Sequence, residues 1–211
     1  MLGKGGGAPA GYMESQPKLK LHLGAGQNHI PGWFNTDLAP QSAEISHLDV
    51  TEPLPFPDAS WDYVFLEHLF EHITYRKGFR LLEEILRILK PNGRVRIATP
   101  DLGQLVALFT RPGDADVQRY MDWAVSFNKL PETGARPCHV MNRLMHGFGH
   151  RFVYDAETLR SSLETVGLTD VAFFEPGKSD DPALRDLEGH GRLIGDSNNR
   201  YETIVAEAQK P

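Results

Sequence analysis

A pair of glycines at the end of an apolar run is the first feature of the sequence that could do chemistry. The segment 19–26 reads LKLHLGAG and alternates apolar and polar residues before it reaches Gly24 and Gly26. This alternation predicts a half-buried strand, and the glycines predict a turn where backbone can approach a ligand closely. Thirteen residues after Gly24, a second short apolar run ends in Asp37. A carboxylate at the end of a second strand beside such a turn is typical of α/β proteins that bind the hydroxyls of a ribose.

Histidines and acids further along the chain form a second group of candidates. Glu67 and His68 directly follow the apolar run WDYVFL. His68 is our first choice for a general base, because the unperturbed pKa of histidine lies near neutrality, although it could instead hydrogen bond to backbone and shape a pocket. Asp101 follows another predicted strand, where it could act in catalysis or cap a helix. His146 and His150 lie among glycines, where they could face a substrate or pack on neighbouring phenylalanines.

The same region also matches a metal-binding pattern. Residues 68–72 read HLFEH, an HxxEH pattern that would place His68 and His72 on one face of a helix, as in a family of zinc proteases. A protease would need a third ligand and a different scaffold. His68 and His72, with His146 or His150, could also bind a metal within another kind of enzyme. Nothing in the sequence requires this, and we assign no metal ligand from the sequence.

Composition narrows the class of protein. The chain has 211 residues, 40% of them hydrophobic, and a net charge of −6, which fits one α/β domain and disfavours nucleic acid as the main partner. The single cysteine excludes an internal disulfide and a cysteine-based zinc site, and it fits a reducing, cytoplasmic location. No apolar run approaches the roughly 20 residues of a membrane helix, so no membrane span is expected.

The elements that must position these residues follow from periodicity. The strands are expected at about 18–23, 34–37, 44–48, 61–66, 94–99, 169–174 and 202–206. Helical spacing extends from His68 to Leu89, where Lys90–Gly93 is expected to end the helix, and a further helix from Asp155 is expected to run to Val166.

The remaining segments fall between these elements. Residues 1–17 are expected to be a flexible leader, residues 102–150 a helical lid inserted over the active edge, with a loop at 130–137, and residues 177–200 a polar loop. Residues 18–211 then form one domain with an open, mostly parallel α/β sheet. Its last two strands close as an antiparallel pair.

The glycine turn is compatible with more than one ligand class. A phosphate-binding GxxxxGK[ST] loop is absent, and a dinucleotide fingerprint would need a third glycine where His29 stands and a longer spacing to the acid. A structural turn with a surface aspartate is the simplest alternative. S-adenosylmethionine (SAM) is the remaining nucleoside ligand.

In this context the chain resembles the class I SAM-dependent methyltransferases from about residue 18 to residue 208. LHLGAG resembles the first motif, NTDL the end of the second strand, HLDV the acidic turn after the third strand, FPDASWDYVFLEHLFEH the fourth-strand motif, and LRILKPNGRVRIATPD the fifth unit. The match is nearest to small bacterial methyltransferase-like proteins of type 11, often associated with cell-surface saccharide synthesis.

This resemblance implies a Rossmann-like sheet of seven strands with an antiparallel last strand. It implies that SAM is the cofactor and S-adenosylhomocysteine the product. The implied cofactor-binding residues are His22, Gly24, Ala25, Gly26, Asp37, Leu38, Asp49, Val50, Glu67 and His68. Two positions depart from the family pattern: His22 stands where an acid is common, and Asn28 where a third glycine is common.

The sequence therefore predicts an enzyme that transfers the SAM methyl group by in-line displacement to a saccharide or another small molecule. The candidate catalytic residues are His68, Asp101, His146 and His150. A metal-dependent hydrolase built on HxxEH, and a binding module that keeps the fold without catalysis, are the two alternatives. Neither the acceptor nor the oligomeric state can be predicted from the sequence.

Overall fold

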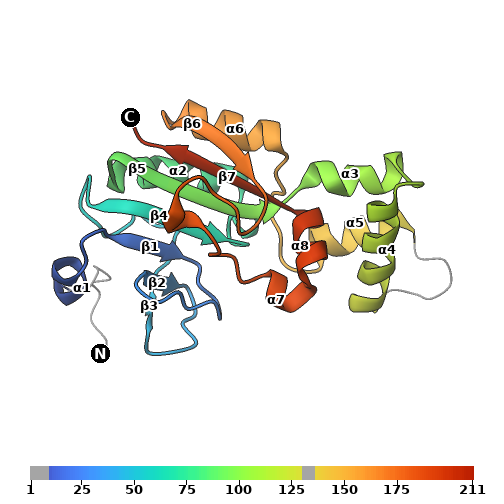
Figure 1. The fold of residues 1–211 in the computed structure, drawn as a ribbon, viewed down its shortest axis with the longest axis horizontal. Helices are drawn as coiled ribbons and strands as arrows, with labels where there is room; N and C mark the ends of the chain where they lie inside the picture. Colours follow the sequence, from blue (N-terminus) through green and yellow to red (C-terminus); the bar gives the residue numbers. More distant parts are fainter. Residues whose placement is uncertain (1–9, 130–135) are drawn as a thin grey trace.

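The computed structural model describes residues 10–129 and 136–211. Its centre is a seven-stranded sheet in the order β3-β2-β1-β4-β5-β7-β6, shown in Figure 1. The strands are β1 (Lys20–Leu23), β2 (Phe34–Asp37), β3 (Ile45–His47), β4 (Trp61–Glu67), β5 (Leu89–Pro100), β6 (Thr169–Phe174) and β7 (Thr203–Gln209).

The first five strands run parallel, and β7 runs antiparallel to both of its neighbours. This confirms the predicted mostly parallel sheet with an antiparallel closing pair. Buried on both faces, β4 carries Val64, Phe65 and Leu66 without exposure, as expected of a central parallel strand. The carboxyl ends of β1, β2, β4 and β5 all lie at one edge of the sheet, where open α/β folds bind their ligands.

Different elements cover the two faces of the sheet. The main core includes α2 (Tyr75–Ile88) and α6 (Ala156–Thr165), whose Leu82, Ile85 and Leu159 are fully buried. On the other face, Phe65 packs with Leu184 and Leu187, which belong to a C-terminal segment far from it in sequence. That segment crosses the sheet on its way to the ligand edge.

Two sequence predictions about helix 68–89 were wrong in detail. The segment begins with a short 3₁₀ helix, η1 (Phe70–His72), and α2 starts only at Tyr75. The predicted helix-ending turn Lys90–Gly93 lies inside β5, where the four residues 90–93 stand opposite the single residue Asp62 of β4 as an enlarged bulge. Asn92 has a φ of +63° there, so the left-handed residue lies one position earlier than the glycine.

The ends of the chain also hold more structure than predicted. Within the predicted leader, α1 (Ala10–Ser15) is helical, and Tyr12 packs on Phe34 and Trp61 while its hydroxyl donates to the carbonyl of Lys20. The predicted loop 177–200 contains three short helices, η2 (Pro182–Leu184), α7 (Gly191–Ile194) and α8 (Asp196–Glu202). Because α8 includes Glu202, the last strand begins one residue later than predicted.

The predicted lid is a small helical layer with its own core. It contains α3 (Leu102–Thr110), α4 (Ala115–Phe127) and α5 (Pro137–His146), and α5 was not predicted as a helix. Leu105, Tyr120, Val140 and Leu144 form a hydrophobic cluster that is separate from the sheet core. These helices and α8 lie beyond the carboxyl edge of the sheet in Figure 1. The predicted loop 130–137 falls largely outside the described residues.

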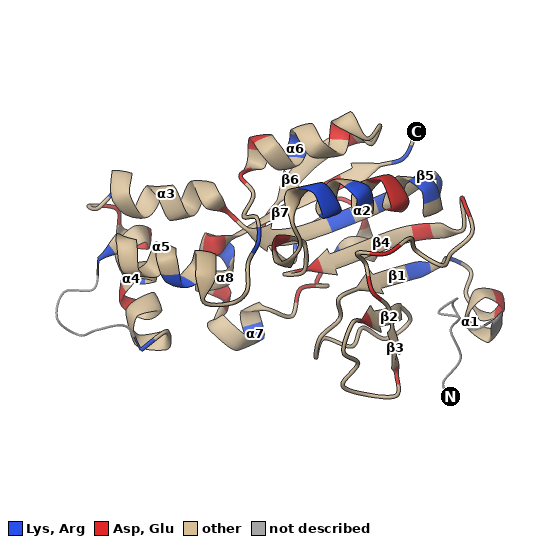
Figure 2. Cartoon of the chain, turned by 180° about the vertical axis from the view of Figure 1, so that it is seen from behind, with Lys and Arg blue, Asp and Glu red and all other residues tan. Residues whose placement is uncertain are grey.

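Charge is distributed without a strong bias along the described chain. In Figure 2, basic and acidic segments alternate over α2 and around the lid helices. Nothing in this pattern adds weight to nucleic acid as the main partner. Among the described residues, no helix combines the length and apolar character needed to cross a bilayer.

Candidate functional site

The glycine turn after β1 is held against β2 by backbone contacts. Gly24 and Gly26 have φ values of +68° and +51°, which residues with a side chain rarely adopt. The amide of Ala25 between them donates to the carbonyl of Thr36 at 2.8 Å. A Cβ on Gly26 would meet no atom within 4 Å, so the space beside this residue is open to a ligand. A Cβ on Gly24 would lie 2.3 Å from Cδ1 of Leu69, so that position is closed by the segment after β4.

Asp37 lies next to this turn, as the sequence predicted. Its Oδ2 accepts a hydrogen bond from the amide of Gly26 at 2.8 Å, and its Oδ1 accepts one from the amide of Ala39 at 2.8 Å. Each carboxylate oxygen can accept more than one hydrogen bond, so both retain capacity for a ligand hydroxyl. The bare backbone at Gly26 and the carboxylate of Asp37 therefore converge on one place.

The neighbouring turn after β3 brings further predicted residues to the same edge. The amide of Leu48 donates to the carbonyl of Asp37 at 2.9 Å, which places Asp49 and Val50 beside the end of β2. Hydrogen bonds from Thr51 keep the pKa of Asp49 below its usual value, so its carboxylate is charged at neutral pH. Leu38 is 62% exposed and offers apolar surface next to Asp37.

His22, predicted to bind the cofactor, is instead a structural residue. Its side chain is 1% exposed, its Nδ1 lies 3.0 Å from Oδ1 of Asn35, and its ring packs against Phe65. Burial lowers its pKa to about 4, so the ring is neutral and joins β1 to β2. A ring that is fully buried between strands has no surface left for a ligand.

Glu67, at the end of β4, contacts the C-terminal segment. Its two carboxylate oxygens accept hydrogen bonds from the amides of Gly189 and His190, each at 2.8 Å. The side-chain amide of Asn28, just after the glycine turn, donates to the same carboxylate at 3.3 Å. Glu67 thus ties the glycine turn to a segment that is distant in sequence.

His68 follows with both ring nitrogens in contact with polar groups. Its Nδ1 lies 3.2 Å from Oε1 of Glu71, and its Nε2 lies 3.3 Å from Oγ1 of Thr203. Burial by itself would lower the pKa of His68, but the hydrogen bond and negative charge of Glu71, with the charges of Glu202 and Glu67, outweigh it and raise the pKa. The residue has a φ of +46°, a strained conformation for a residue with a side chain.

A cavity of about 350 Å³ lies between His68 and the lid helices. Most of its wall is apolar and aromatic, whereas histidines and acids gather at the end nearest β4. The lining residues are His68, Glu71, His72, Pro100, Tyr120, Trp123, Phe127, Asn128, Leu144, Phe148, His150, His190, Leu193, Ile194 and Glu202.

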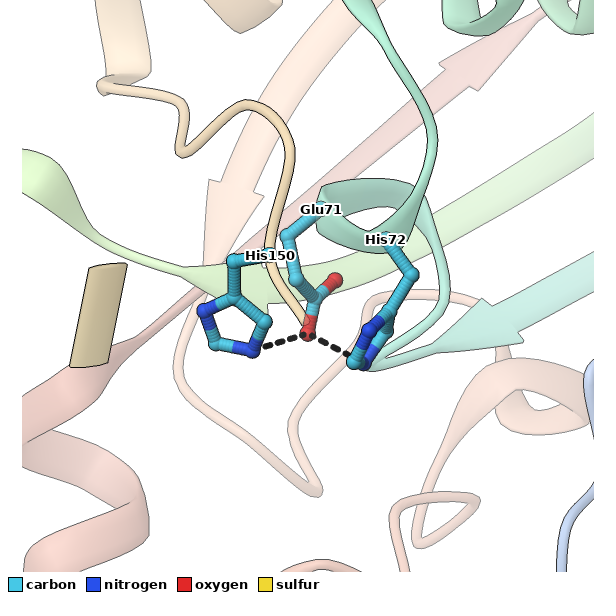
Figure 3. A group of neighbouring side chains, drawn as sticks. All are labelled: Glu71, His72 and His150. Atoms are coloured by element: carbon cyan, nitrogen blue, oxygen red, sulfur yellow. Dashed lines mark ion pairs between the residues drawn. The ribbon is translucent and has the colours of Figure 1, made fainter. Parts of the chain in front are cut away.

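Glu71, His72 and His150 form a cluster at the polar end of this cavity, shown in Figure 3. Nε2 of His72 and Nε2 of His150 each lie 3.9 Å from Oε1 of Glu71, which is fully buried. Burial lowers the pKa of His150, so its ring is neutral at neutral pH. The predicted HxxEH pair of His68 and His72 does not form the donor set, because η1 is a single 3₁₀ turn and Glu71 stands between them.

The other predicted catalytic residues lie elsewhere. Asp101 accepts a hydrogen bond from the amide of Gly103 at 2.7 Å and caps α3, as its structural alternative predicted. His146 is exposed in the last turn of α5 and does not line the cavity. Sequence reasoning missed His190 and Glu202, whose side chains lie 3.1 Å apart in the cavity wall. They fall in the polar segment near the C-terminus, where no motif marks them.

Comparison with known proteins agrees with this architecture. Residues 2–97 match the family model described as "Methyltransferase domain". The chain is 29% identical over 123 residues to a ubiquinone/menaquinone biosynthesis C-methyltransferase UbiE of Idiomarina loihiensis, covering 58% of this chain and 44% of that protein. It is 31% identical over 134 residues to a demethylmenaquinone methyltransferase of Clavibacter sepedonicus, covering 61% and 47%. The chain thus spans less than half the length of these relatives.

A solved structure extends the likeness to nearly the whole chain. A SAM-dependent methyltransferase from Archaeoglobus fulgidus superposes with a TM-score of 0.52 at 18% identity, covering 95% of this chain and 89% of that one. At this identity the likeness concerns the fold. The family model covers less than half of this chain; together with the sequence relatives and the sheet topology, it makes the chain similar to class I SAM-dependent methyltransferases.

Proposed function

We propose that this protein transfers the methyl group of SAM to a small acceptor with an apolar body that binds in the cavity beneath the lid. One observation carries the proposal. Glu67 contacts Asn28 of the glycine turn, and the next residue, His68, lines the cavity. The nucleoside crevice and the cavity therefore meet within one residue at the end of β4, which is the adjacency that direct transfer between two bound molecules requires.

The residues of the crevice fit the cofactor. Asp37 would accept hydrogen bonds from the ribose hydroxyls, the open backbone at Gly26 would allow close approach, and Asp49 would lie toward the adenine. Leu38 and Val50 would contact the base. When bound, SAM supplies an activated methyl group, whose carbon–sulfur bond breaks as the acceptor's electron pair forms the new bond and the old pair leaves on sulfur. The protein aligns the two molecules and excludes water.

His68 would act by positioning its neighbours rather than by taking a proton. Both of its ring nitrogens already have polar partners, and its raised pKa favours the charged form, which cannot accept a proton. We therefore assign to His68 the second of its two predicted roles, that of shaping the pocket. An acceptor that is already nucleophilic, such as an amine or an electron-rich ring carbon, needs no base.

The cavity wall favours an aromatic acceptor over a saccharide. Tyr120, Trp123, Phe127 and Phe148 line it, so sugar hydroxyls that face this aromatic part of the wall would lose their water and gain few partners. A flat apolar ring with a polar group at one edge would place that group near His150. The names of the two curated relatives, which refer to quinones, support an acceptor of this kind.

Neither alternative function gains support from the geometry. A hydrolase on the HxxEH pattern would need His68 as a ligand, but its nitrogens contact Glu71 and Thr203. A binding module without catalysis would need no cavity beside the crevice. A measurement of transfer separates these alternatives from the proposal.

The first test is cofactor binding by thermal shift. SAM should raise the melting temperature of the full chain, because a ligand stabilises the folded state that it binds, and NAD should not. Asp37→Ala should abolish the shift, whereas the matched control Asp58→Ala, which removes an exposed carboxylate paired with Arg87, should retain it. A normal shift in Asp37→Ala would contradict the ribose assignment.

The second test is methyl transfer itself. Radiolabelled methyl from SAM should appear in naphthohydroquinone, used as a flat aromatic probe, and not in glucose. Transfer to glucose instead would overturn the assignment of an apolar acceptor. Transfer to neither probe, despite a normal SAM shift, would count against aromatic hydroquinones as the acceptor class.

A further inference from the structure

The cluster of Glu71, His72 and His150 has the composition of a metal site. Its donors are two imidazole nitrogens and one carboxylate oxygen, all within 4.8 Å of one another. Two histidines and one carboxylate, with further positions open, is a donor set used by catalytic zinc and by non-haem iron. We propose that these three residues bind one divalent transition-metal ion at the polar end of the cavity, an inference that rests on the proposed function for its chemical role.

The spacing of the donors supports this proposal. The nitrogens of His72 and His150 each lie 3.9 Å from the same oxygen of Glu71, which is too far for a hydrogen bond. Ligand atoms at about 2.0–2.2 Å from one zinc ion lie roughly 3.3–3.6 Å apart in tetrahedral coordination. A movement of a few tenths of an ångström would bring each nitrogen–oxygen pair to this spacing, and the three donors, all within 4.8 Å of one another, would draw together around an ion.

The protein holds the three donors in place from outside the cluster. The carbonyl of Glu71 accepts hydrogen bonds from the amides of Arg151 and Phe152, at 2.7 and 3.2 Å, which fixes the His150 loop against η1. Gly149 has a φ of +81°, the left-handed turn that directs His150 inward.

Side-chain contacts from outside the cluster also orient the carboxylate of Glu71. Its Oε2 accepts a hydrogen bond from the hydroxyl of Thr99 at 3.1 Å, and its Oε1 faces His68 as well as the two other histidines. Partners of this kind orient metal-binding carboxylates and fix which oxygen faces the ion. His68 thus contacts the ligand rather than the ion.

Burial of the Glu71 carboxylate favours binding of a cation at this site. Glu71 is fully buried and His150 is 7% exposed, so the carboxylate has lost its water. The donor nitrogen of His150 is Nε2, which faces Glu71. Its Nδ1 faces away from the cluster and has no hydrogen-bond partner among the described residues. The His72 side chain is 41% exposed, which leaves a path for an ion to enter.

Such an ion would supply an activation that His68, whose two ring nitrogens contact Glu71 and Thr203, does not provide. A hydroxyl of the acceptor bound at an open position would release its proton to solvent water more readily, because the ion stabilises the resulting oxyanion. The oxygen, or the ring carbon conjugated with it, then provides the electron pair for the bond to the methyl carbon. The oxidation state of the ion does not change in this step.

The test is zinc binding by the full chain in the absence of any acceptor. Chelator-treated, tag-free protein is dialysed against zinc chloride, and the bound metal is counted. We expect one zinc ion per chain, and at least tenfold weaker binding in His72→Ala, whose exposed side chain can be removed without emptying the core. His146→Ala is the matched control, because it removes an exposed histidine four residues from His150, and it should bind zinc as the natural chain does.

A second readout identifies the ligands. Cobalt(II) bound at the site should give visible absorption bands that His72→Ala loses. The proposal is overturned if the natural chain binds no zinc, or if His72→Ala binds zinc as tightly as His146→Ala. A SAM thermal shift in the chelated protein keeps the two proposals apart: if it persists without zinc binding, only the metal site is wrong, and if it too is absent, the proposed function fails.

Discussion

The nucleoside crevice and the lid cavity are built in opposite ways. The crevice comes from residues 24–50, in which the amides of Ala25 and Gly26 donate to the carbonyl of Thr36 and the carboxylate of Asp37, and the turn after β3 is joined to β2 by a backbone hydrogen bond. The cavity comes from residues 68–202, and side chains of η1, the lid helices α4 and α5, α7 and α8 make its wall. Backbone groups form most of the crevice, whereas packed side chains form the wall of the cavity.

This difference indicates which region can change. A crevice fixed by main-chain geometry suits a ligand that never varies, since few substitutions alter backbone amides. A cavity lined by side chains on helices with a separate core can be reshaped without disturbing the sheet. The two regions meet at Glu67 and His68, and the C-terminal segment around His190 touches both.

The largest expected effect comes from releasing the C-terminal segment around His190, which contacts both the crevice and the cavity. Arg96, fully buried in β5, donates to Glu188 at 2.7 Å and to the carbonyl of Lys178 at 2.9 Å, and it also contacts Glu207. Arg96→Met would leave the buried carboxylate of Glu188 without its cation and would leave Glu207 with only Arg94 at 3.7 Å, which costs about 3–5 kcal/mol. We expect that loss in the free energy of unfolding by urea titration. A loss below about 1 kcal/mol would mean that the segment is held by other contacts.

The next effect concerns the crevice alone and depends on pH. The pKa of His22 is about 4 in the folded state and about 6.5 unfolded, so the unfolded chain binds an extra proton between these values. Stability is fully present above pH 6.5 and falls toward pH 4, by about 3 kcal/mol in total.

His22→Gln should remove this part of the pH dependence, because an amide does not titrate and can still donate to Asn35. The measurement is the free energy of unfolding at pH 7 and at pH 4.5 for both chains. Equal losses in the two chains would show that His22 does not titrate as its burial implies.

Substitutions at the two glycines of the turn separate a structural role from a binding role within the crevice. Gly24→Ala places a methyl group against Leu69 at a positive φ, and should cost about 2 kcal/mol of stability. Gly26→Ala adds its methyl group to open space, so it should cost about 1 kcal/mol and weaken S-adenosylhomocysteine binding about tenfold. Urea unfolding and calorimetric titration measure the two quantities. Unchanged binding in Gly26→Ala would place the ligand elsewhere.

The smallest expected effect comes from a substitution in the cavity wall. Trp123→Ala should raise KM for the naphthohydroquinone probe about tenfold and leave S-adenosylhomocysteine affinity unchanged, because Trp123 lines only the acceptor side. Phe109→Ala, which removes an exposed aromatic residue of α3 away from the cavity, is the control and should change neither value. A matching loss of S-adenosylhomocysteine affinity in Trp123→Ala would show that the crevice and the cavity act as one site.

The sequence predicted the sheet, and it predicted that Asp37 lies beside the glycine turn, because both depend on local patterns. Strand alternation and the glycines of LHLGAG placed β1 and its turn, and the spacing to Asp37 placed the carboxylate. The same reasoning misplaced His22, because alternation does not tell which strand neighbour a polar side chain meets. Asn35, its hydrogen-bond partner, lies on another strand.

The cavity could not be predicted to the same extent, because it depends on contacts between distant segments. His190 and Glu202 come from a segment without apolar periodicity, and only the folding of α8 onto the lid brings them to Tyr120. The HLFEH pattern lies at residues 68–72, but the single 3₁₀ turn there groups its side chains differently from the pattern. Glu71 and His72 join His150, and His68 turns toward Thr203.

The central claim is that a methyl group passes directly from a cofactor bound in the crevice at Gly26 and Asp37 to an acceptor bound in the cavity at His68. A crystal structure with S-adenosylhomocysteine bound tests this claim most directly. We predict ribose hydroxyls on the carboxylate of Asp37 and the sulfur atom at the His68 end of the cavity, open toward the aromatic wall. A nucleoside bound elsewhere, or a sulfur atom walled off from the cavity by side chains, would contradict it.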